Sequence, residues 1–424
     1  MIKFISYYTF KVISIITFFL LNESIIGMDE KKFQTDCPGR LVKIPEGVYA
    51  FVPTPLPPSN LQLDLKIINL LSEANQSLGE LKGVASNLPN PYFLIGPLRA
   101  REAILSSKLE GTITTAEELI MYEAQGEKGR VRDETREVSN YIKAMEYGLA
   151  RLKELPLSNR LIREVHAKLM EDVRGQEYSP GEFRKHQNYI GMKGQKIEDG
   201  RFVPPPVLDM IKALSDLESF FHDQNELPPL VKLAIIHYQF ETIHPFMDGN
   251  GRIGRLLITL MLCDWKQLGE PLLYMSSYFE RNKDLYMDLL FAISQKGAWI
   301  EWIEFFLRGV IIQSLDAIIR VKKLLMLQSQ YRQKIQTIRT SALQLKLVDE
   351  LFLSPWTTMS RAADVMGITR MSAQNNINKL VKAGILREST GRPRDRVYIA
   401  TGIIEIINRD SFDKKEIETT ETHS

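Results

Sequence analysis

The chain has 424 residues, of which 44% are hydrophobic and 25% charged, an ordinary composition for a globular protein of two or three domains. Its formal net charge of +2 excludes nucleic-acid binding through overall charge, so a DNA-binding surface would have to be local. Cys37 and Cys263 lie far apart, which argues against a disulfide framework and against a cysteine zinc site.

Residues 1–28 differ in composition from the rest of the chain. The stretch 4–21 is largely apolar and aromatic, and Lys11 is its only charge. This pattern is typical of a signal peptide or a single membrane anchor, although no A-x-A-like cleavage site follows it. The alternative is that the true start is Met28 and that the upstream residues come from an overextended reading frame.

Residues 29–155 are predicted to form an N-terminal helical region. The segment 29–60 is rich in proline and turn formers and predicts an extended arm that leads into the helices. Further helices are expected over 97–124 and 134–154. The first helical apolar face is formed by Ile67, Leu71, Ala74, Leu78 and Leu81.

Residues 156–310 form the predicted central domain, which is mostly amphipathic helix. The segment 188–206 interrupts it with three glycines and short apolar pieces, which predicts a β-hairpin. A helical connector is expected over 311–340, a last domain over 341–400, and a polar tail with little to bury over 401–424.

Residues 244–255 read HPFMDGNGRIGR and combine several groups that suit phosphate chemistry. Pro228 and Pro229 open an apolar helix that runs to about Ile243, so His244 is expected at its C-terminal end. Gly249 to Gly251 make a tight turn into a second, buried helix. Unpaired N–H groups at a helix N-terminus favour an anion, and glycines let the backbone approach it.

The side chains of this segment fit the same chemistry. Arg252 and Arg255 are three residues apart, so both can grip phosphates from one helical turn. Asp248 supplies the oxygen ligand that Mg²⁺ prefers. His244 can accept a hydroxyl proton near neutral pH. The alternative is a helix-capping turn with a satisfied histidine and two surface arginines.

This segment resembles the signature of the Fic family, H-P-F-x-[D/E]-G-N-G-R-x-x-R, and matches it at every fixed position. The resemblance implies a protein adenylyltransferase that uses ATP and Mg²⁺, with His244 as the base and Asp248 as the metal ligand. Asn250 and the glycine amides would then cradle the α-phosphate region, and Arg255 would bind the γ-phosphate. The nucleotide-binding residues implied are Asp248, Gly249, Asn250, Gly251, Arg252, Ile253, Gly254 and Arg255.

Two further segments resemble parts of Fic proteins. Residues 180–184 and 188–191 resemble the approach to the family's flap hairpin, and 202–206 resemble its exit. The resemblance implies that a protein target docks on the hairpin 188–206 by strand addition; the alternative is an ordinary exposed hairpin. Arg281 and Asn282 are candidates for the adenine side of the site, or plain surface residues.

Ser106, Glu110 and Gly111 match the inhibitory pattern S/T-x-x-x-E-G/N of many Fic proteins, in a helical segment upstream of the signature. A glutamate that faces Arg255 would form a charge-assisted pair and keep this arginine from the γ-phosphate. The alternative is that Glu110 caps or solvates a surface helix.

The segment 360–398 resembles a winged helix-turn-helix domain, with its wing at 388–396. Its charge of +5 suits contacts with DNA phosphates, but winged helices also dock proteins or dimerise. Its basic residues are Arg361, Arg370, Lys379, Lys382, Arg387, Arg392, Arg394 and Arg396.

The sequence therefore predicts a mainly α protein: an N-terminal helical region with an inhibitory helix, a Fic-type helical core with a β-hairpin flap, and a C-terminal winged helix. We expect AMP transfer from ATP to a Ser, Thr or Tyr hydroxyl of a protein or of the enzyme itself. Removal of AMP, another nucleotide donor, and a nucleotide-sensing DNA-binding regulator are the alternatives. A homodimer is a further expectation. We expect a cytoplasmic protein, or an anchored or exported one if residues 1–27 are genuine.

Overall fold

The computed structural model describes residues 28–86, 92–125, 133–173, 179–191, 194–224, 226–336 and 342–409. The leader predicted over 1–27 therefore lies outside the described residues. Among the described residues, no helix combines the length and the apolarity needed to cross a membrane.

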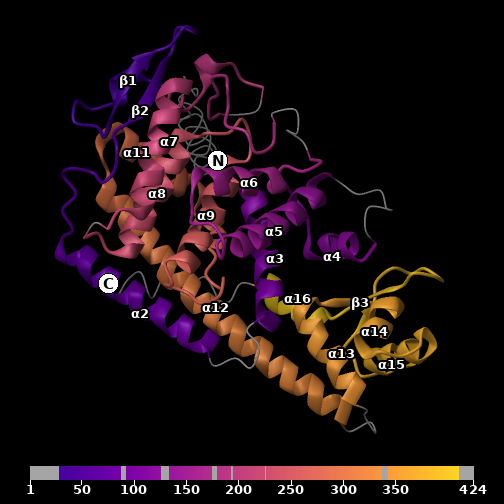
Figure 1. The fold of residues 1–424 in the computed structure, drawn as a ribbon. Coiled ribbons are helices and arrows are strands. Elements are labelled where there is room, and N and C mark those ends of the chain that lie inside the picture. Colours follow the sequence, from indigo (N-terminus) through magenta and orange to yellow (C-terminus); the bar gives the residue numbers. More distant parts are fainter. Residues whose placement is uncertain are drawn as a thin grey trace, which may run out of the picture.

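The described chain is mainly helical, which confirms the predicted fold class (Figure 1). The helices are η1 Glu30–Lys32, α2 Leu65–Ser86, α3 Tyr92–Leu109, α4 Ala116–Gln125, α5 Asp133–Arg151, α6 Asn159–Leu169, η4 Ile197–Asp199, α7 Val207–His222, α8 Pro229–Ile243, α9 Asn250–Asp264, α10 Ser276–Arg281, α11 Lys283–Lys296, α12 Trp299–Gln336, α13 Ala342–Leu353, α14 Met359–Met366, α15 Arg370–Lys382 and α16 Thr401–Asn408. The strands are β1 Gly39–Lys43, β2 Tyr49–Pro53, β3 Trp356–Thr358, β4 Arg387–Glu388 and β5 Val397–Ile399.

Helix α8 lies at the centre of the core. Nearly all of its side chains are buried, including the polar His237 and Gln239, so it has no solvent-facing stripe. Trp302 of α12 is fully buried beside it and donates its indole N–H to the Ala234 carbonyl at 2.9 Å. The helix that ends at His244 is thereby fixed within the core.

Helix α12 crosses the predicted boundary at residue 310 without a break. It runs from the core to the C-terminal domain, and α2 packs along it (Figure 1). Apolar residues continue through this stretch, and no glycine pair or proline interrupts it. The core and the connector therefore share one helix.

The predicted extended arm contains a β-hairpin, in which β1 pairs antiparallel with β2 from Gly39 opposite Pro53 to Lys43 opposite Tyr49. The predicted hairpin at 188–206 is reduced to one antiparallel bridge between Ile190 and Phe202. The end of the segment also contacts β2, where the Phe51 N–H donates to the Val203 carbonyl. The reason is local: η4 occupies the middle of the segment, so two paired strands do not form among its described residues.

The C-terminal domain contains α13 to α15 and a three-stranded antiparallel sheet of order β3-β5-β4. The winged-helix interpretation itself stays a prediction. The predicted polar tail was wrong for residues 401–408, which form α16 and bury Ile403, Ile404 and Ile407. These three isoleucines are spaced to face one side of a helix, a pattern that the acidic and polar residues after them masked in the sequence.

A buried arginine attaches α16 to α12. Arg320 is 1% exposed and is paired with Asp316 one turn earlier, with Nε to Oδ2 at 2.7 Å. Its other nitrogens donate to the carbonyls of Ile406, Ile407 and Arg409 at the C-terminal end of α16. The guanidinium therefore satisfies carbonyls that a helix end leaves unpaired.

Helix α3 lies between the core and the C-terminal domain (Figure 1). On one side a methyl group at Gly96 would overlap the carbonyl oxygen of Leu353 in α13, so the two backbones are in direct contact. On the other side the buried Glu102 accepts hydrogen bonds from the Ser276 N–H and hydroxyl and from the Tyr141 hydroxyl. These contacts fix the position from which the end of α3 reaches the site.

Candidate functional site

The loop between α8 and α9 has a fixed shape because its own residues close it. His244 ends α8 in the left-handed conformation with φ 49°, and Gly249 precedes α9 with φ 81°. The Asn250 amide accepts from the Phe246 N–H and donates to the Phe246 carbonyl, both at 2.8 Å. Asn250 thus builds the turn with its side chain, and its predicted contact with phosphate stays a prediction.

Three side chains from other segments hold this loop. The Asn188 amide donates to the carbonyls of His244 and Phe246, and Arg184 donates from Nε to the His244 carbonyl at 3.1 Å. The His166 ring accepts the Gly181 N–H at Nδ1, so its Nε2–H donates to the Asp248 carbonyl at 3.0 Å. Sequence reasoning missed the role of His166, which lies 82 residues from the loop that it holds.

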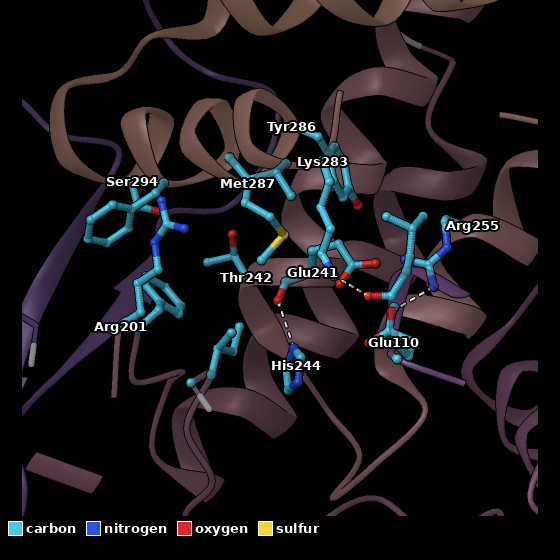
Figure 2. A pocket seen from close by; sticks show the side chains of 18 residues that line it. Glu110, Arg201, Glu241, Thr242, His244, Arg255, Lys283, Tyr286, Met287 and Ser294 are labelled. Carbon is cyan, nitrogen blue, oxygen red and sulfur yellow. Dashed lines mark hydrogen bonds and ion pairs between the residues drawn. The ribbon is translucent and has the colours of Figure 1, made fainter. Parts of the chain in front are cut away.

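The imidazole of His244 is oriented by a backbone carbonyl. Nδ1 lies 3.2 Å from the Glu241 carbonyl oxygen, which can only accept, so Nδ1 carries the proton (Figure 2). Nε2 is left unprotonated and without a hydrogen-bond partner in the described part of the chain. Burial lowers the pKa of His244 to about 4. The ring is therefore a neutral base at physiological pH.

His244 faces a cavity of about 380 Å³, a size typical of small-molecule sites. Of the predicted site residues, Glu110, Gly111, His244, Gly251 and Arg255 line it. Its other lining residues include Ile190, Gly191, Arg201, Phe202, Glu241, Thr242, Lys283, Tyr286, Met287, Leu290, Phe291 and Ser294 (Figure 2).

One wall of the cavity was not predicted. Arg281 and Asn282 do not line it: Arg281 donates to Ser277, and Asn282 donates to the Tyr278 carbonyl at 2.9 Å. The wall is formed instead by α11, with Lys283 and Tyr286 among its residues. Helical periodicity alone could have shown that one face of α11 is apolar. It could not have shown that this face meets the signature loop, residues 244–249 between α8 and α9.

Asp248 and Arg252 lie beside the cavity rather than in its lining. Arg252 is 3% exposed. Its Nη1 lies 3.5 Å from Glu137 Oε2, and its Nη2 lies 3.4 Å from Asp248 Oδ1. Its Nε and Nη1 have no hydrogen-bond partner among the described residues. A buried cation with unused donors is suited to an anion.

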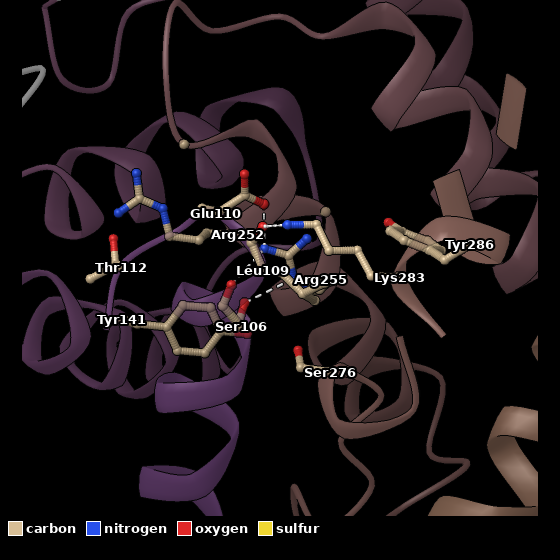
Figure 3. Close-up of polar contacts among 12 residues, drawn as sticks. Ser106, Leu109, Glu110, Thr112, Tyr141, Arg252, Arg255, Ser276, Lys283 and Tyr286 are labelled. Carbon is tan, nitrogen blue, oxygen red and sulfur yellow. Dashed lines mark hydrogen bonds and ion pairs between the residues drawn. The ribbon is translucent and has the colours of Figure 1, made fainter. Parts of the chain in front are cut away.

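The end of α3 and the residue after it contact Arg255. The buried guanidinium donates to the Ser106 hydroxyl and carbonyl, each at 2.9 Å, and to Glu110 Oε1 at 2.6 Å (Figure 3). Burial alone would raise the pKa of Glu110, but the charge of Arg255 outweighs it and lowers this pKa. Glu110 is therefore ionised in a charge-assisted pair.

The same carboxylate covers the start of α9. A methyl group at Gly251 would overlap Glu110 Oε1, so this oxygen lies directly over the backbone of the first helical turn. The first N–H groups of a helix have no partner within it and attract anions. Glu110 thus lies against the first turn of α9.

Glu241 forms the neighbouring wall. Burial raises its pKa to about 8, and its Oε1 has no hydrogen-bond partner in the described part of the chain. At neutral pH the protonated form predominates. The wall beside Arg255 therefore adds little negative charge that would repel a polyphosphate.

Two family models match the chain. The Fic/DOC family N-terminal model matches residues 68–150, and the Fic/DOC family model matches residues 156–262, which include α8, α9 and the signature loop. This chain carries both domains of the Fic family. The predicted resemblance to Fic proteins is thereby confirmed over these residues.

Curated relatives carry the same family name. The chain is 34% identical over 137 residues to "Protein adenylyltransferase Fic" of Drosophila grimshawi, which is 32% of this chain and 26% of that protein. It is 32% identical over 209 residues to the protein of the same name from Drosophila mojavensis, which is 48% of this chain and 37% of that protein. The chain therefore spans about a quarter to about a third of these relatives' length.

The fold also resembles a solved structure. A crystal structure of a Fic family protein from Desulfovibrio desulfuricans G20 matches 81% of this chain and 98% of its own, with a TM-score of 0.52 and 22% identity. At this identity the match supports the Fic fold and carries no further detail of the site.

Proposed function

We propose that this Fic protein is a nucleotidyltransferase that moves AMP from ATP to a Ser, Thr or Tyr hydroxyl of a protein. One observation carries the proposal: the unprotonated Nε2 of His244 and the anion-attracting start of α9 with Arg255 face one cavity. A base and a phosphate cradle in one cavity suit transfer at phosphorus, which depends mainly on positioning and charge neutralisation.

In the proposed reaction, His244 Nε2 accepts the proton of the target hydroxyl as its oxygen attacks the α-phosphorus. The bond from the α-phosphorus to the bridging oxygen breaks, and pyrophosphate leaves with the bonding electrons. The first N–H groups of α9 would hold α-phosphate oxygens, and Arg255 would neutralise charge on the leaving group.

Mg²⁺ fits this site as a partner of the nucleotide. Among the described residues, no group of three or more His, Cys, Asp or Glu could hold a metal unaided. Mg²⁺ is commonly held by one or two carboxylates together with substrate phosphates, and it neutralises their charge. Asp248 suits this role because it is 48% exposed and uses only Oδ1 for the Gly249 N–H and Arg252.

The proposed target is a protein that lies along the segment 188–206. Ile190, Gly191 and Phe202 line the cavity that His244 faces, so a chain placed beside them would bring its hydroxyl near the base. The single bridge at Ile190 and Phe202 leaves backbone groups for strand addition. The protein itself is a second expected target.

The direct test follows the labelled phosphorus. With Glu110→Gly protein, Mg²⁺ and a cell lysate, we expect protein to be labelled from α-³²P-ATP and not from γ-³²P-ATP. Label from the γ-position would indicate phosphorylation and overturn the proposal. Binding of ATP without label from either position would also overturn it, and would turn attention to AMP removal or another nucleotide donor.

As a second function, we propose that the C-terminal domain binds duplex DNA. Six exposed basic residues on α15 and between β4 and β5 have no ion pair in the described part of the chain: Arg370, Lys379, Lys382, Arg392, Arg394 and Arg396. By contrast, Arg361 pairs with Glu350, and Arg387 pairs with Glu117 of α4. Unpaired cations on one domain suit DNA phosphates.

A mobility-shift assay with the full chain tests this second function. We expect binding that weakens steeply between 50 and 200 mM salt, and a salt slope smaller by about two in the double variant Arg392→Gln, Arg394→Gln. Arg409→Gln, which removes an exposed charge that lies outside α15 and the segment between β4 and β5, is the control. No retention of DNA at low salt would overturn DNA binding and favour protein docking or a homodimer. Because ATP use and DNA binding both take place inside a cell, we also propose that this protein acts in the cytoplasm.

A further inference from the structure

Lys283 holds the end of the inhibitory helix from inside the cavity. It is the first residue of α11, and its Nζ donates to the carbonyl of Leu109 at 2.7 Å (Figure 3). Leu109 is the last residue of α3 and directly precedes Glu110. The cation thus contacts the helix at its C-terminal end, where carbonyls lack partners within the helix and positive charge is favourable.

Two cations from different elements therefore meet the same helix end. Arg255 of α9 takes Ser106 and the Glu110 carboxylate, and Lys283 of α11 takes the Leu109 carbonyl. Both cations line the cavity, and Figure 2 shows Lys283 reaching across it toward Glu110. The groups that hold α3 closed are thus also the positive groups that a polyphosphate in this cavity would meet.

The Leu109 carbonyl is a weaker partner for Lys283 than a phosphate would be. The carbonyl is neutral, whereas a polyphosphate offers charged oxygens, so the ammonium gains an attraction between opposite charges that the carbonyl does not supply. Lys283 is on a flexible stem in an exposed position, so its ammonium can change partner without movement of α11.

We propose that Lys283 is a positioning residue with two alternating partners. With α3 in place it holds the Leu109 carbonyl, and with α3 displaced it binds the β- and γ-phosphate oxygens of the nucleotide. This inference rests on the proposed function. It makes the nucleotide and the inhibitory helix compete for the same two cations.

The experiment compares Lys283→Met, Lys283→Arg and the control Lys296→Met, which removes the same charge from the other end of α11. Each is made in the intact chain and in the Glu110→Gly background. In the intact chain, Lys283→Met is expected to speed amide hydrogen exchange over residues 106–112 and to raise the basal rate of AMP transfer at saturating ATP about threefold. In the Glu110→Gly background it is expected to raise the KM for ATP about tenfold, with kcat within about twofold.

Lys283→Arg is expected to restore both properties toward those of the parent, and Lys296→Met to change neither. Unchanged exchange with Lys283→Met would overturn the contact with α3, and an unchanged KM would overturn the contact with phosphate. The inference needs both. If Glu110→Gly transfers no label at all, the proposed function fails, while hydrogen exchange and calorimetric ATP binding still report on Lys283 alone.

Discussion

Replacing Glu110 with glycine is expected to raise the initial rate of AMP transfer about a hundredfold. The carboxylate pairs with Arg255 at 2.6 Å and covers the backbone of Gly251, the cation and the helix start that would hold the nucleotide in the proposed reaction. Glycine removes both obstacles at once. The measurement is the initial rate of protein labelling from α-³²P-ATP at a fixed Mg²⁺ concentration.

Two further variants separate charge from volume. Glu110→Gln keeps the size of the side chain but not its charge, so it is expected to give a smaller rise than glycine. Glu117→Gln removes an exposed carboxylate that pairs with Arg387 and is expected to leave the rate unchanged. Equal initial rates for Glu110→Gly and the parent chain would refute inhibition by this contact.

The signature loop was predictable because its shape depends on neighbours in the sequence. Pro229 begins α8, Ile243 ends it, and Gly249 supplies the positive φ that starts α9. The sequence places all three within a short stretch, and each acts on backbone next to itself. The positions of His244 and Arg255 follow from that local geometry.

The contact between Glu110 and Arg255 could also be predicted from the sequence, although 145 residues separate the partners. The motif around Glu110 identified its helix through the family resemblance, and charge then identified its partner. What the motif did not reveal is the second contact, over Gly251. That one depends on the exact height at which α3 ends above α9.

The rest of the site depends on packing between distant segments. His166 holds the loop from α6, and Lys283 and Tyr286 form the wall on α11, but none of them belongs to a local pattern. Arg281 and Asn282, the candidates for the adenine side of the site, precede the helix that lines the cavity. The sequence does not show that α10 ends at Arg281 and that α11 begins at Lys283. Such side chains become visible only once the helices are assembled.

His244→Ala in the Glu110→Gly background is expected to lower kcat about 10² to 10⁴-fold. Alanine removes the only group that both lines the cavity and presents an unprotonated ring nitrogen to it among the described residues. The KM for ATP is expected to change little, because Arg255 and the start of α9 remain. An Arg255→Met variant should show the opposite pattern, with a raised KM, and serves as the comparison.

The protonation state of His244 gives this prediction a second, independent readout. Burial lowers its pKa from 6.5 to about 4, so the ring is expected to stay neutral from pH 8 down to about pH 5 and to gain a proton only below that. An exposed histidine would be roughly three-quarters protonated at pH 6 and unable to act as a base. Proton NMR of the nucleotide-free protein, with the resonance assigned by its absence in His244→Gln, measures this directly. A midpoint near 6.5 would show that the ring is solvated rather than buried, and the expected insensitivity of the base to mildly acidic pH would then be wrong.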